Sequence, residues 1–372
     1  MNPHQSAELI AGGPAVLAGE PSLINYLDAV NAFTLASEAD ALTGRVAAAS
    51  FKHVSPAGAA LGGPIDDVTT EIWGAPAALE DSLLAAYLRA RDADPKSSFG
   101  DVVALSRPVD LQTAEFLRTV ICDAVIAPGF EPGVLAVLAA KKSGRFLVFE
   151  ADPAAQVPTR ERREVLGVTI EQDRDTADLA AALPADPLLD ARTRADALLG
   201  MVVARYTQSN SVALIKGGAA VGIGAGQQNR VDCVRLAGAK ARIWWLRRHP
   251  YVRELPAVPG MKRQDRLNWQ IRFAGREMTR SQLNDFGQLF GDEAHARYDE
   301  PGWRDRWTQG LNDIVMVSDG YLPFRDNVEH AAEYGVTTII EPGGSARTGE
   351  VLDAAHAHGI THVQTGLRLF HH

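Results

Sequence analysis

Short apolar runs typical of β-strands alternate along most of this chain with longer stretches of helical apolar spacing. The expected strands are residues 46–51, 102–105, 120–126, 146–149, 212–216, 220–223, 336–340 and 361–363. Helices are expected at 77–91, 111–119, 133–140, 190–205, 228–245 and 349–358, and before the first strand, where Leu23, Leu27, Val30 and Phe33 recur at helical spacing. This alternation predicts a layered α/β fold.

Two segments interrupt the alternation and divide the chain into lobes. Residues 152–186 are rich in proline and charge and are interpreted as a connection. Residues 250–310 are polar, helix-like and rich in Arg, Gln and Trp, which suggests a small helical insertion. The predicted organisation is a first lobe over 1–188 and a second lobe built from 189–249 and 311–372, with the insertion between its two parts.

Charge and cysteine content restrict the class of protein. The 372 residues carry a net charge of −9, which argues against general affinity for nucleic acid or membranes. An anionic substrate must therefore bind in a local basic pocket. No apolar run approaches the roughly 18 residues that span a bilayer, and the N-terminal residues lack the pattern of a signal peptide. Cys122 and Cys233 are the only cysteines, so we expect a reducing, cytoplasmic location.

The segment from Ser50 to Gly58 joins a strand to polar, turn-forming residues. Lys52 and His53 follow the small apolar strand, and the Ser-Pro-Ala-Gly after them is interpreted as a βα turn. Open α/β sheets place their chemistry at the ends of strands. A histidine there can accept a proton at neutral pH, and a lysine can hold an anion. Because neighbours on a strand point to opposite faces, the two side chains share a site only if the strand has ended at Lys52.

The run Gly-Ile-Gly-Ala-Gly at 222–226 has only part of a dinucleotide-binding fingerprint. The third glycine of G-x-G-x-x-G would fall at Gln227, so the fingerprint fails. Two interpretations stay open: backbone N–H groups that bind an anion or an amide-rich ring beside Gln228 and Arg230, or a tight structural turn. Zinc-deaminase chemistry is excluded because the two cysteines are far apart in the sequence, and no G-x-S-x-G motif indicates a serine hydrolase.

Other polar residues occur within or beside apolar strands. Asp123 stands in the strand 120–126, where a carboxylate must be paired or hydrogen-bonded and is either a structural cap or a ligand contact. Asn210 lies in a polar stretch between a helix and a strand, which either orients an amide-bearing substrate or forms a plain turn. The apolar strand before the C-terminal Leu-Arg-Leu-Phe-His-His predicts that this terminus is docked on the fold.

Together, and in this order, these segments resemble the AICAR transformylase domain of the bifunctional purine-biosynthesis enzyme that also carries IMP cyclohydrolase. The matching stretches are residues 2–5 (Asn-Pro-His-Gln), 50–62, 97–101, 123–129, 206–211, 222–230, 323–327 and 367–372. The resemblance spans the whole chain, and the cyclohydrolase half that normally precedes it is absent. We therefore expect a stand-alone transformylase, for which a separate IMP cyclohydrolase is a candidate partner.

The resemblance implies a duplicated cytidine-deaminase-like α/β/α fold without zinc, and an intertwined homodimer with active sites between the subunits. It implies transfer of a formyl group from 10-formyltetrahydrofolate to the 5-amino group of AICAR, giving FAICAR and tetrahydrofolate in purine biosynthesis. The amine is a poor nucleophile and must lose a proton as it attacks. No catalytic metal is expected, and a bound structural monovalent cation is left open.

The family pattern assigns roles to individual residues of this chain. His53 is expected to be the base, Lys52 to stabilise the developing oxyanion, and Asn210 to orient the carboxamide and amine. The nucleotide is expected to contact Asn25, Phe99, Gly100, Asp123 and Arg368, and the folate to contact Asn229, Arg230, Tyr321, Pro323, Phe324 and Asn327.

The chain departs from the family pattern at three places. Family members carry Arg-Tyr-Gly just before the residue that precedes Asn-Pro-His-Gln, whereas this sequence begins at Met1 without that nucleotide-contacting Arg and Tyr. Two interpretations stay open: the start site is assigned too late, or phosphate affinity is weakened. Asn229 stands where a serine is frequent, and an aromatic pair is represented by Tyr321-Leu322. The first departure favours an alternative, a paralogue that formylates a different heteroaromatic amine. A non-catalytic nucleotide- or folate-binding protein is a second alternative, against which the complete set of expected catalytic side chains argues.

Overall fold

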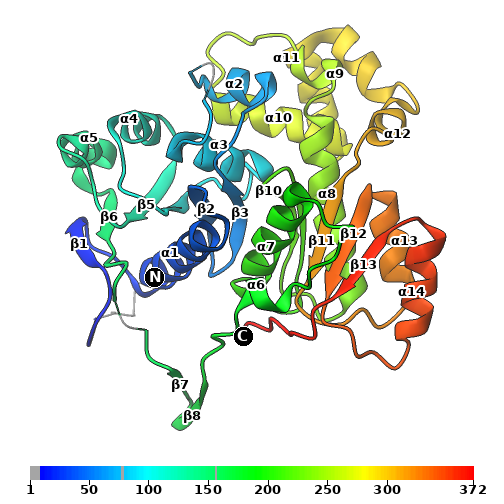
Figure 1. Ribbon diagram of the computed structural model, residues 1–372. Coiled ribbons are helices and arrows are strands. Elements are labelled where there is room, and N and C mark those ends of the chain that lie inside the picture. The colour runs from blue at the N-terminus through cyan, green and yellow to red at the C-terminus, as the bar shows by residue number, and fades with distance from the viewer. Residues whose placement is uncertain (1–8, 77–78, 156) are drawn as a thin grey trace.

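The computed structural model describes residues 9–76, 79–155 and 157–372, and its central feature is a mixed sheet of eleven strands (Figure 1). The order across the sheet is β1-β6-β5-β4-β2-β3-β10-β9-β11-β12-β13. Helices cover both faces: α1 and α7 pack with one face, and α3 and α8 pack on the other. The predicted α/β class is confirmed.

The elements have the following bounds. The strands are β1 Ala15–Ala18, β2 Ala47–Phe51, β3 Pro56–Leu61, β4 Asp101–Leu105, β5 Cys122–Ala127, β6 Leu147–Glu150, β7 Arg160–Val165, β8 Val168–Asp173, β9 Val212–Lys216, β10 Ala219–Gly224, β11 Ile314–Ser318, β12 Val336–Glu341 and β13 Thr361–Gln364. The helices are α1 Leu23–Thr43, α2 Asp67–Trp73, α3 Leu83–Ala93, α4 Leu111–Thr119, α5 Val134–Ala139, α6 Leu179–Ala182, α7 Ala191–Arg205, α8 Arg230–Leu246, α9 Pro250–Arg253, α10 Arg263–Gly275, α11 Arg280–Asp299, α12 Trp303–Thr308, α13 Asp326–Glu333 and α14 Thr348–Ala357.

The two halves of the sheet repeat one arrangement. From the centre outwards, the first half runs β3-β2-β4-β5-β6 and the second runs β10-β9-β11-β12-β13. In each half the first two pairings are antiparallel and the last two are parallel. The halves join through β3 and β10, where Ala60 pairs with Ala219. One continuous sheet therefore carries both halves, while the division into lobes at residues 188, 249 and 310 stays a prediction.

The segment after Phe51, expected as a βα turn, is instead a hairpin. β2 turns back through residues 52–55 into β3, so Pro-Ala-Gly begins a strand. Pro56 is tolerated as the first residue of that strand. Gly58 lets α3 approach closely, because a Cβ there would come 2.0 Å from the Ala90 carbonyl oxygen. The prediction was wrong because proline and glycine are typical of turns, whereas here the glycine serves a helix–strand contact.

The glycine-rich run at 222–226 allows the same close helix–strand contact in the second half of the sheet. Gly222 and Gly224 lie in β10, where Cβ atoms would come 2.1 Å from the carbonyl oxygens of Ala237 and Cys233 in α8. Both halves thus use glycine on the central strands to bring one helix against the sheet. Gly222 and Gly224 therefore have a packing role within a strand, which differs from the tight turn that was one of the two open interpretations.

Residues 250–310 form a helical segment with its own apolar cluster. Phe273, Phe286 and Trp303 are buried within that cluster, which draws on α9 to α12. Two residues of α10, Leu267 and Ile271, belong instead to the apolar cluster that combines α2, α3 and α4 with strands of the first half of the sheet. The helical segment is therefore anchored through α10 to the first half of the fold.

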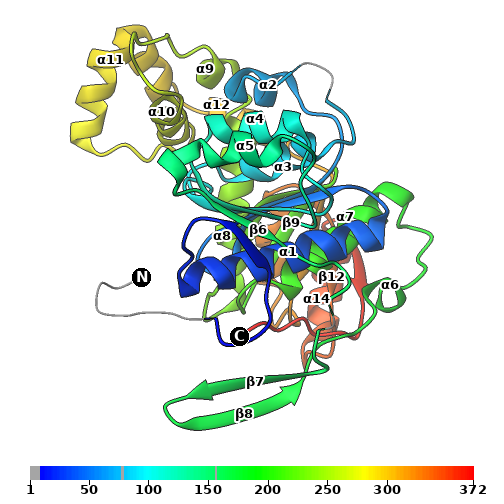
Figure 2. The ribbon, with the colours of Figure 1, turned by 90° about the vertical axis from the view of Figure 1, so that its left-hand side faces the viewer.

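The segment 152–186, expected only as a connection, contains a two-stranded hairpin. β7 and β8 pair with each other and extend away from the body of the molecule (Figure 2). Most residues of the two strands are charged or polar, so apolar periodicity did not reveal them. The apolar side chains Val165, Leu166, Val168 and Ile170 are all exposed.

Helix α1 exists as predicted, but its bulky apolar stripe is not the buried one. Leu23, Leu27 and Val30 are exposed, whereas alanines and Leu35 face the sheet together with Asp28. The spacing of the bulky residues identified the helix correctly. It leaves α1 with an apolar outer surface that the described part of the chain does not cover.

The start of α3 and the position of the C-terminal residues also test the sequence predictions. The helix expected from residue 77 begins at Leu83, because the Ser82 side chain accepts a hydrogen bond from the Ala85 backbone N–H and caps it. The C-terminal residues are docked as predicted. The Leu369 N–H donates to the Asp319 carbonyl oxygen at 2.8 Å.

Candidate active site

A tight turn after β2 presents Lys52 and His53 at the edge of the sheet. β2 ends at Phe51, so the condition for the two side chains to share a site is met. His53 and Val54 have φ values of 56° and 59°, which reverse the chain within two residues. The Lys52 N–H donates to the Ser55 carbonyl oxygen at 3.0 Å and closes the turn. The His53 side chain is exposed.

Asp28 of α1 holds this turn from within the fold. Its carboxylate, only 5% exposed, accepts hydrogen bonds from the N–H of Val54 at 2.5 Å and of His53 at 3.3 Å. Burial raises the pKa of Asp28, and these backbone hydrogen bonds only partly offset that rise. Sequence reasoning missed Asp28. The available signal was an acid on the alanine-rich face of the helix, which the bulky apolar stripe on the other face obscured.

The Lys52 side chain contacts one predicted nucleotide position, Phe99, and the next residue, Gly100, is a second. Its ammonium donates to the Phe99 carbonyl oxygen at 2.6 Å. Gly100, with a φ of 77°, lies beside Asp123, since a Cβ on this glycine would come 3.5 Å from Asp123 Oδ2. Asp123 is half-buried and paired with Lys142, so the expectation that this carboxylate is paired is confirmed. Lys142 is a second residue that sequence reasoning missed.

Asn25, the remaining predicted nucleotide position on this side, lies in the first turn of α1. Its side-chain oxygen accepts hydrogen bonds from the Ser22 N–H at 2.9 Å and the Ser22 hydroxyl at 2.7 Å. The carbonyl group of Asn25 therefore caps the helix. A ligand contact through its NH₂ group stays a prediction.

The second group of predicted residues is built on a buried ion pair in the other half of the sheet. Arg230 donates to the Asp319 carboxylate, to Asn210 Oδ1 at 2.8 Å and to the Ser211 carbonyl oxygen at 3.0 Å. Asn210 donates through Nδ2 to the Gln227 carbonyl oxygen at 3.0 Å. The amide of Asn210 is therefore held in one orientation. Asp319, fully buried, was missed because the sequence around it carries no recognisable motif.

The predicted folate positions near this ion pair differ in exposure. Tyr321 and Phe324 are exposed, and Pro323 is half-buried. Asn327 is buried, and its NH₂ group donates to the Phe324 carbonyl oxygen at 2.9 Å, so this side chain shapes the loop from inside. Arg368 is exposed, with its guanidinium carbon 5.8 Å from the centre of the Tyr321 ring. A folate contact by Asn327 stays a prediction.

Asn229 caps the helix that Arg230 begins. Its side-chain oxygen accepts from the Asp232 N–H at 2.9 Å, and its NH₂ group donates to the Asp232 carboxylate at 2.5 Å. Asn229 therefore caps α8, and serine, which is frequent at this position in the family pattern, is also a preferred N-cap residue.

The two groups lie at one edge of the sheet but in different halves. β2, β3, β10 and β9 are successive antiparallel neighbours, so the end of β2 and the start of β9 share an edge. Three interstrand steps separate them, which amounts to roughly 14 Å. Among the described residues, no hydrogen bond joins Lys52 or His53 to Asn210. The structure brings each group together but keeps the two groups apart within one chain.

Residues 9–76, 79–155 and 157–372 contain neither a metal-ligand cluster nor a helix that could span a membrane. In these ranges no three His, Cys, Asp or Glu side chains are arranged to hold a metal ion. No helix there combines the length and apolar character needed to cross a bilayer. The Asn-Pro-His-Gln stretch at 2–5 lies outside the described residues.

Comparison with known proteins identifies the family. A family model described as AICARFT/IMPCHase bienzyme matches residues 1–240, which is more than half of the chain. The chain belongs to the AICARFT/IMPCHase bienzyme family. The resemblance seen in the sequence is confirmed. The part of this chain that the family model matches contains Lys52, His53, Asn210 and Arg230.

Curated relatives in this family match the chain over its full length. The bifunctional purine biosynthesis protein PurH of Cereibacter sphaeroides (strain ATCC 17029 / ATH 2.4.9) is 32% identical over 388 residues. The protein of the same name from Roseobacter denitrificans (strain ATCC 33942 / OCh 114) is 33% identical over 390 residues. Both alignments cover 100% of this chain and 58% of the relative, so the chain spans 58% of the length of these relatives.

Proposed function

We propose that this protein transfers a formyl group from 10-formyltetrahydrofolate to the 5-amino group of AICAR, giving FAICAR and tetrahydrofolate in purine biosynthesis. The observation that carries the proposal is the turn bearing Lys52 and His53, fixed by Asp28 and Phe99 at the sheet edge of an AICARFT/IMPCHase family member. The relatives named for purine biosynthesis support the same reaction.

The chemistry requires a proton acceptor and a cationic group next to each other. The amine nitrogen of AICAR attacks the formyl carbon and gives a tetrahedral oxyanion, and the carbon–N10 bond then breaks with its electron pair on the folate nitrogen. His53, exposed at the turn, takes the proton from the amine and returns it to N10. The Lys52 ammonium stabilises the oxyanion. Asn210, held by Arg230, orients the carboxamide.

The nucleotide is proposed to bind around Gly100 and Asp123. The glycine leaves room beside the Asp123 carboxylate, which can accept hydrogen bonds from ligand hydroxyls. Exposed Arg368 can form charge-assisted hydrogen bonds to the phosphate. Tyr321 and Phe324 offer exposed rings for the folate.

The finer fold assignment is a duplicated cytidine-deaminase-like α/β/α fold. It is supported by the repeated strand order and directions in the two halves of the sheet. The proposed lobes are residues 1–188, and 189–249 with 311–372, with 250–310 as the helical insertion. The separate apolar cluster of that segment supports its treatment as an insertion.

A homodimer with shared sites is proposed for two structural reasons. Roughly 14 Å separates the end of β2 from the start of β9 within one chain, so a partner that supplies one of the two groups would complete the site. The exposed stripe Leu23, Leu27 and Val30 of α1, together with the projecting β7–β8 hairpin, offers apolar surface for such a partner.

A steady-state assay of the purified protein with AICAR and 10-formyltetrahydrofolate tests the reaction, with tetrahydrofolate release followed by ultraviolet absorbance. Turnover that depends on both substrates is expected. Folate binding without turnover would contradict the choice of AICAR and favour a different amine. Failure to bind either substrate would contradict the proposal altogether.

A further inference from the structure

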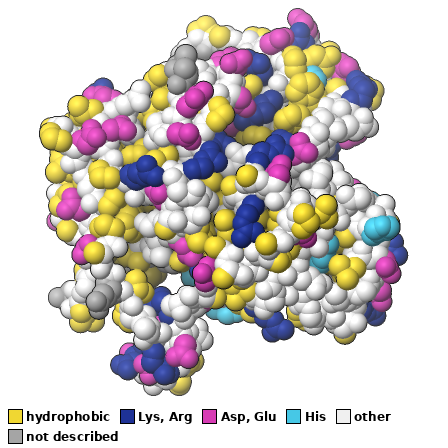
Figure 3. All heavy atoms as spheres, viewed as in Figure 1, with side chains coloured by type: hydrophobic (Ala, Val, Ile, Leu, Met, Phe, Trp, Pro, Cys, Tyr) yellow, Lys and Arg dark blue, Asp and Glu magenta, His cyan; other side chains and the backbone are white. Residues whose placement is uncertain are grey.

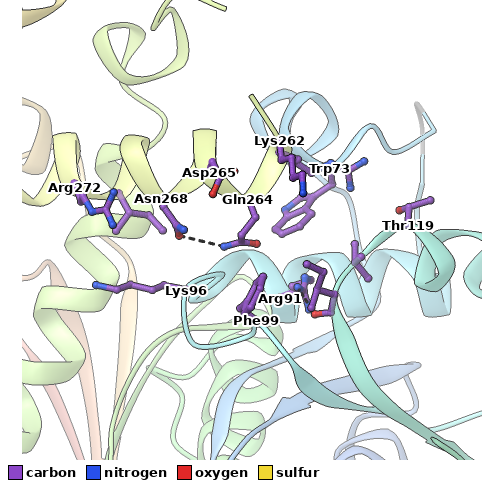
Figure 4. A pocket seen from close by; sticks show the side chains of 14 residues that line it. Trp73, Arg91, Lys96, Phe99, Thr119, Lys262, Gln264, Asp265, Asn268 and Arg272 are labelled. Atoms are coloured by element: carbon purple, nitrogen blue, oxygen red, sulfur yellow. Dashed lines mark hydrogen bonds between the residues drawn. The ribbon is translucent and has the colours of Figure 1, made fainter. Parts of the chain in front are cut away.

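A buried ion pair lies next to the turn that carries Phe99. Arg91 of α3, whose side chain is 1% exposed, donates to Oδ1 of Asp101 at the start of β4 at 2.8 Å. Figure 4 shows Arg91 and Phe99 next to each other on the wall of an open pocket, opposite α10. Lys and Arg side chains gather around a hollow in the upper half of the face shown in Figure 3. Arg91 differs from exposed basic side chains because a carboxylate inside the fold neutralises its charge.

Two serines extend this ion pair toward the proposed reaction centre. Ser50 Oγ lies 2.6 Å from Asp101 Oδ2 and 2.8 Å from Ser98 Oγ, and both serines are fully buried. Because a hydroxyl has one hydrogen and an ionised carboxylate has none, Ser50 donates to Asp101 and Ser98 donates to Ser50. Ser50 is two residues before Lys52, and Ser98 directly precedes Phe99. A chain of buried hydrogen bonds therefore links the segment that carries Lys52 to the segment that carries its acceptor.

Arg91 also holds the other side of the Phe99 turn. Its second terminal nitrogen donates to the Ile121 carbonyl oxygen at 3.0 Å, and the Gly100 N–H donates to the same oxygen at 3.0 Å. Arg91 donates in addition to the Tyr87 hydroxyl oxygen at 3.0 Å. The turn is thus tied to the ion pair on both sides. The side chains that reach the serine side of the turn are named the β2–β4 network: Arg91, Asp101, Ser50 and Ser98.

The backbone ladder between β2 and β4 ends before it reaches this part of the site. The last pair of residues at this end of the ladder is Phe51 with Val102. Lys52 and Phe99 lie beyond that pair, where the Lys52 ammonium donates to the Phe99 carbonyl oxygen at 2.6 Å. The distance between the two segments therefore depends on side-chain hydrogen bonds. A buried hydrogen-bonded network is suited to this purpose because it restricts its members to one arrangement.

We propose that the β2–β4 network positions the Lys52 ammonium for catalysis by fixing the Phe99 turn relative to the end of β2. The inference rests on the proposed function, in which Lys52 stabilises the oxyanion of the tetrahedral intermediate. The four network residues act through Lys52 and are positioning residues, not catalytic ones. Because oxyanion stabilisation depends on the placement of the donor, a looser Phe99 turn lowers kcat and has little effect on KM.

The test is a double-mutant cycle on kcat with Ser50→Ala and Ser98→Ala in the full chain. Each single variant should lower kcat by about tenfold, while the KM values for AICAR and folate change by less than about twofold. The double variant should be no slower than the slower single variant, because both substitutions break the same chain of hydrogen bonds.

Ser106→Ala is the matched control. Ser106 lies at the opposite end of the same strand pair, where its hydroxyl donates to Asp40 Oδ2 at 2.6 Å and accepts from the Ala47 N–H at 2.9 Å. Its loss also removes a serine–aspartate hydrogen bond but should leave kcat unchanged. Thermal unfolding shows whether each variant folds. Ser98→Ala keeps the ion pair and its bond to Ser50, so this variant carries the test if Ser50→Ala does not fold.

An unchanged kcat in either single variant would overturn the proposal, as would independent, multiplicative effects in the double variant. A second measurement does not depend on the reaction: the rate at which an acetylating reagent modifies Lys52, followed by peptide mass spectrometry relative to exposed Lys262. Ser98→Ala should raise this rate, because the Phe99 carbonyl oxygen no longer holds the Lys52 nitrogen in place. An unchanged rate would also overturn the proposal. If the wild type supports no turnover, the proposed function fails, and faster modification of Lys52 in Ser98→Ala would still support the positioning role.

Discussion

The proposed chemistry depends on how single residues hold the turn that carries Lys52 and His53. Two consecutive residues with positive φ are costly for side chains such as histidine and valine. The Asp28 carboxylate offsets this cost by accepting both of their N–H groups. The Lys52 ammonium is fixed separately by the Phe99 carbonyl oxygen. The positions of the two side chains are thus set by neighbours that no local sequence motif contains.

The substitution His53→Ala should reduce kcat by at least about 100-fold, as loss of a general base does. The His53 side chain is exposed and makes no hydrogen bond among the described residues, so the unfolding temperature should stay close to that of the wild type. Steady-state kinetics and thermal unfolding measure the two quantities. Near-normal turnover would remove His53 from the mechanism.

The substitution Asp28→Ala should lower kcat about tenfold by releasing the turn, and should destabilise the fold by about 1–3 kcal/mol, since two N–H groups lose their acceptor. Asp28→Asn keeps one acceptor oxygen and should recover part of both losses. The KM for AICAR and kcat, measured separately, distinguish a positioning role from simple destabilisation. If both variants are less stable than the wild type but retain full kcat, Asp28 has only a structural role.

At the scale of elements, close helix–strand packing explains glycines that resemble turn or ligand-loop signals. Gly58→Ala should destabilise the protein by about 1–3 kcal/mol, because its Cβ would collide with the backbone of α3. Gly349→Ala is the control: it is helical, its Cβ would meet no atom within 4 Å, and it should be neutral or slightly stabilising. Chemical denaturation measures both. Equal stabilities of the two variants would refute the packing role.

The turn that carries Phe99 is held by Asp94, which accepts hydrogen bonds from the Ser97 N–H at 3.0 Å and hydroxyl at 2.6 Å and pairs with Lys240 of α8 at 3.0 Å. Burial acts to raise the pKa of Asp94, but Lys240 and Ser97 outweigh it and leave the pKa below its ordinary value. A depressed folded-state pKa stabilises the fold above the unfolded pKa near 4, and this stabilisation is lost as the pH falls through the folded value.

The substitution Asp94→Asn should therefore lower the free energy of unfolding at pH 7 by roughly 1 kcal/mol, as charged hydrogen bonds are lost. The difference from wild type should shrink as the pH is lowered below about 4. Urea denaturation at a series of pH values measures it. A difference that does not change with pH would show that the charge of Asp94 contributes nothing.

Apolar periodicity predicted the α/β class and most of the central strands, because buried strands and long helices have strong local patterns. It failed for β7 and β8, whose residues are mostly polar, and for β3, whose Pro56 and Gly58 are typical of turns. The candidate site was predictable only where residues match a family motif. Asp28, Lys142 and Asp319 were missed because their roles arise from contacts between segments distant in sequence.

In the whole molecule, the repeated half-sheets place the Lys52 group and the Asn210 group at one edge but on different strands. If each site combines the Lys52 group of one subunit with the Asn210 group of its partner, two inactive variants should complement each other. Mixtures of Lys52→Ala and Asn210→Ala, dissociated and re-formed together, should regain about one quarter of wild-type activity, because half of the dimers of a two-fold assembly are mixed and each has one intact site.

The same mixture without re-forming the dimers is the control and should stay inactive. Absence of recovery after subunit exchange, verified by mixed dimers in native mass spectrometry, would place both groups of a site in one chain. A ligand would then have to bridge the end of β2 and the start of β9.

The most direct measurement is to follow the formyl group itself. Wild-type protein is incubated with AICAR and 10-formyltetrahydrofolate labelled in the formyl carbon, and the nucleotide product is analysed by mass spectrometry. We expect labelled FAICAR from the wild type and labelling that is at least about 100-fold slower with His53→Ala. Label that stays on the folate, or that reaches the nucleotide equally fast without His53, would contradict the proposed reaction.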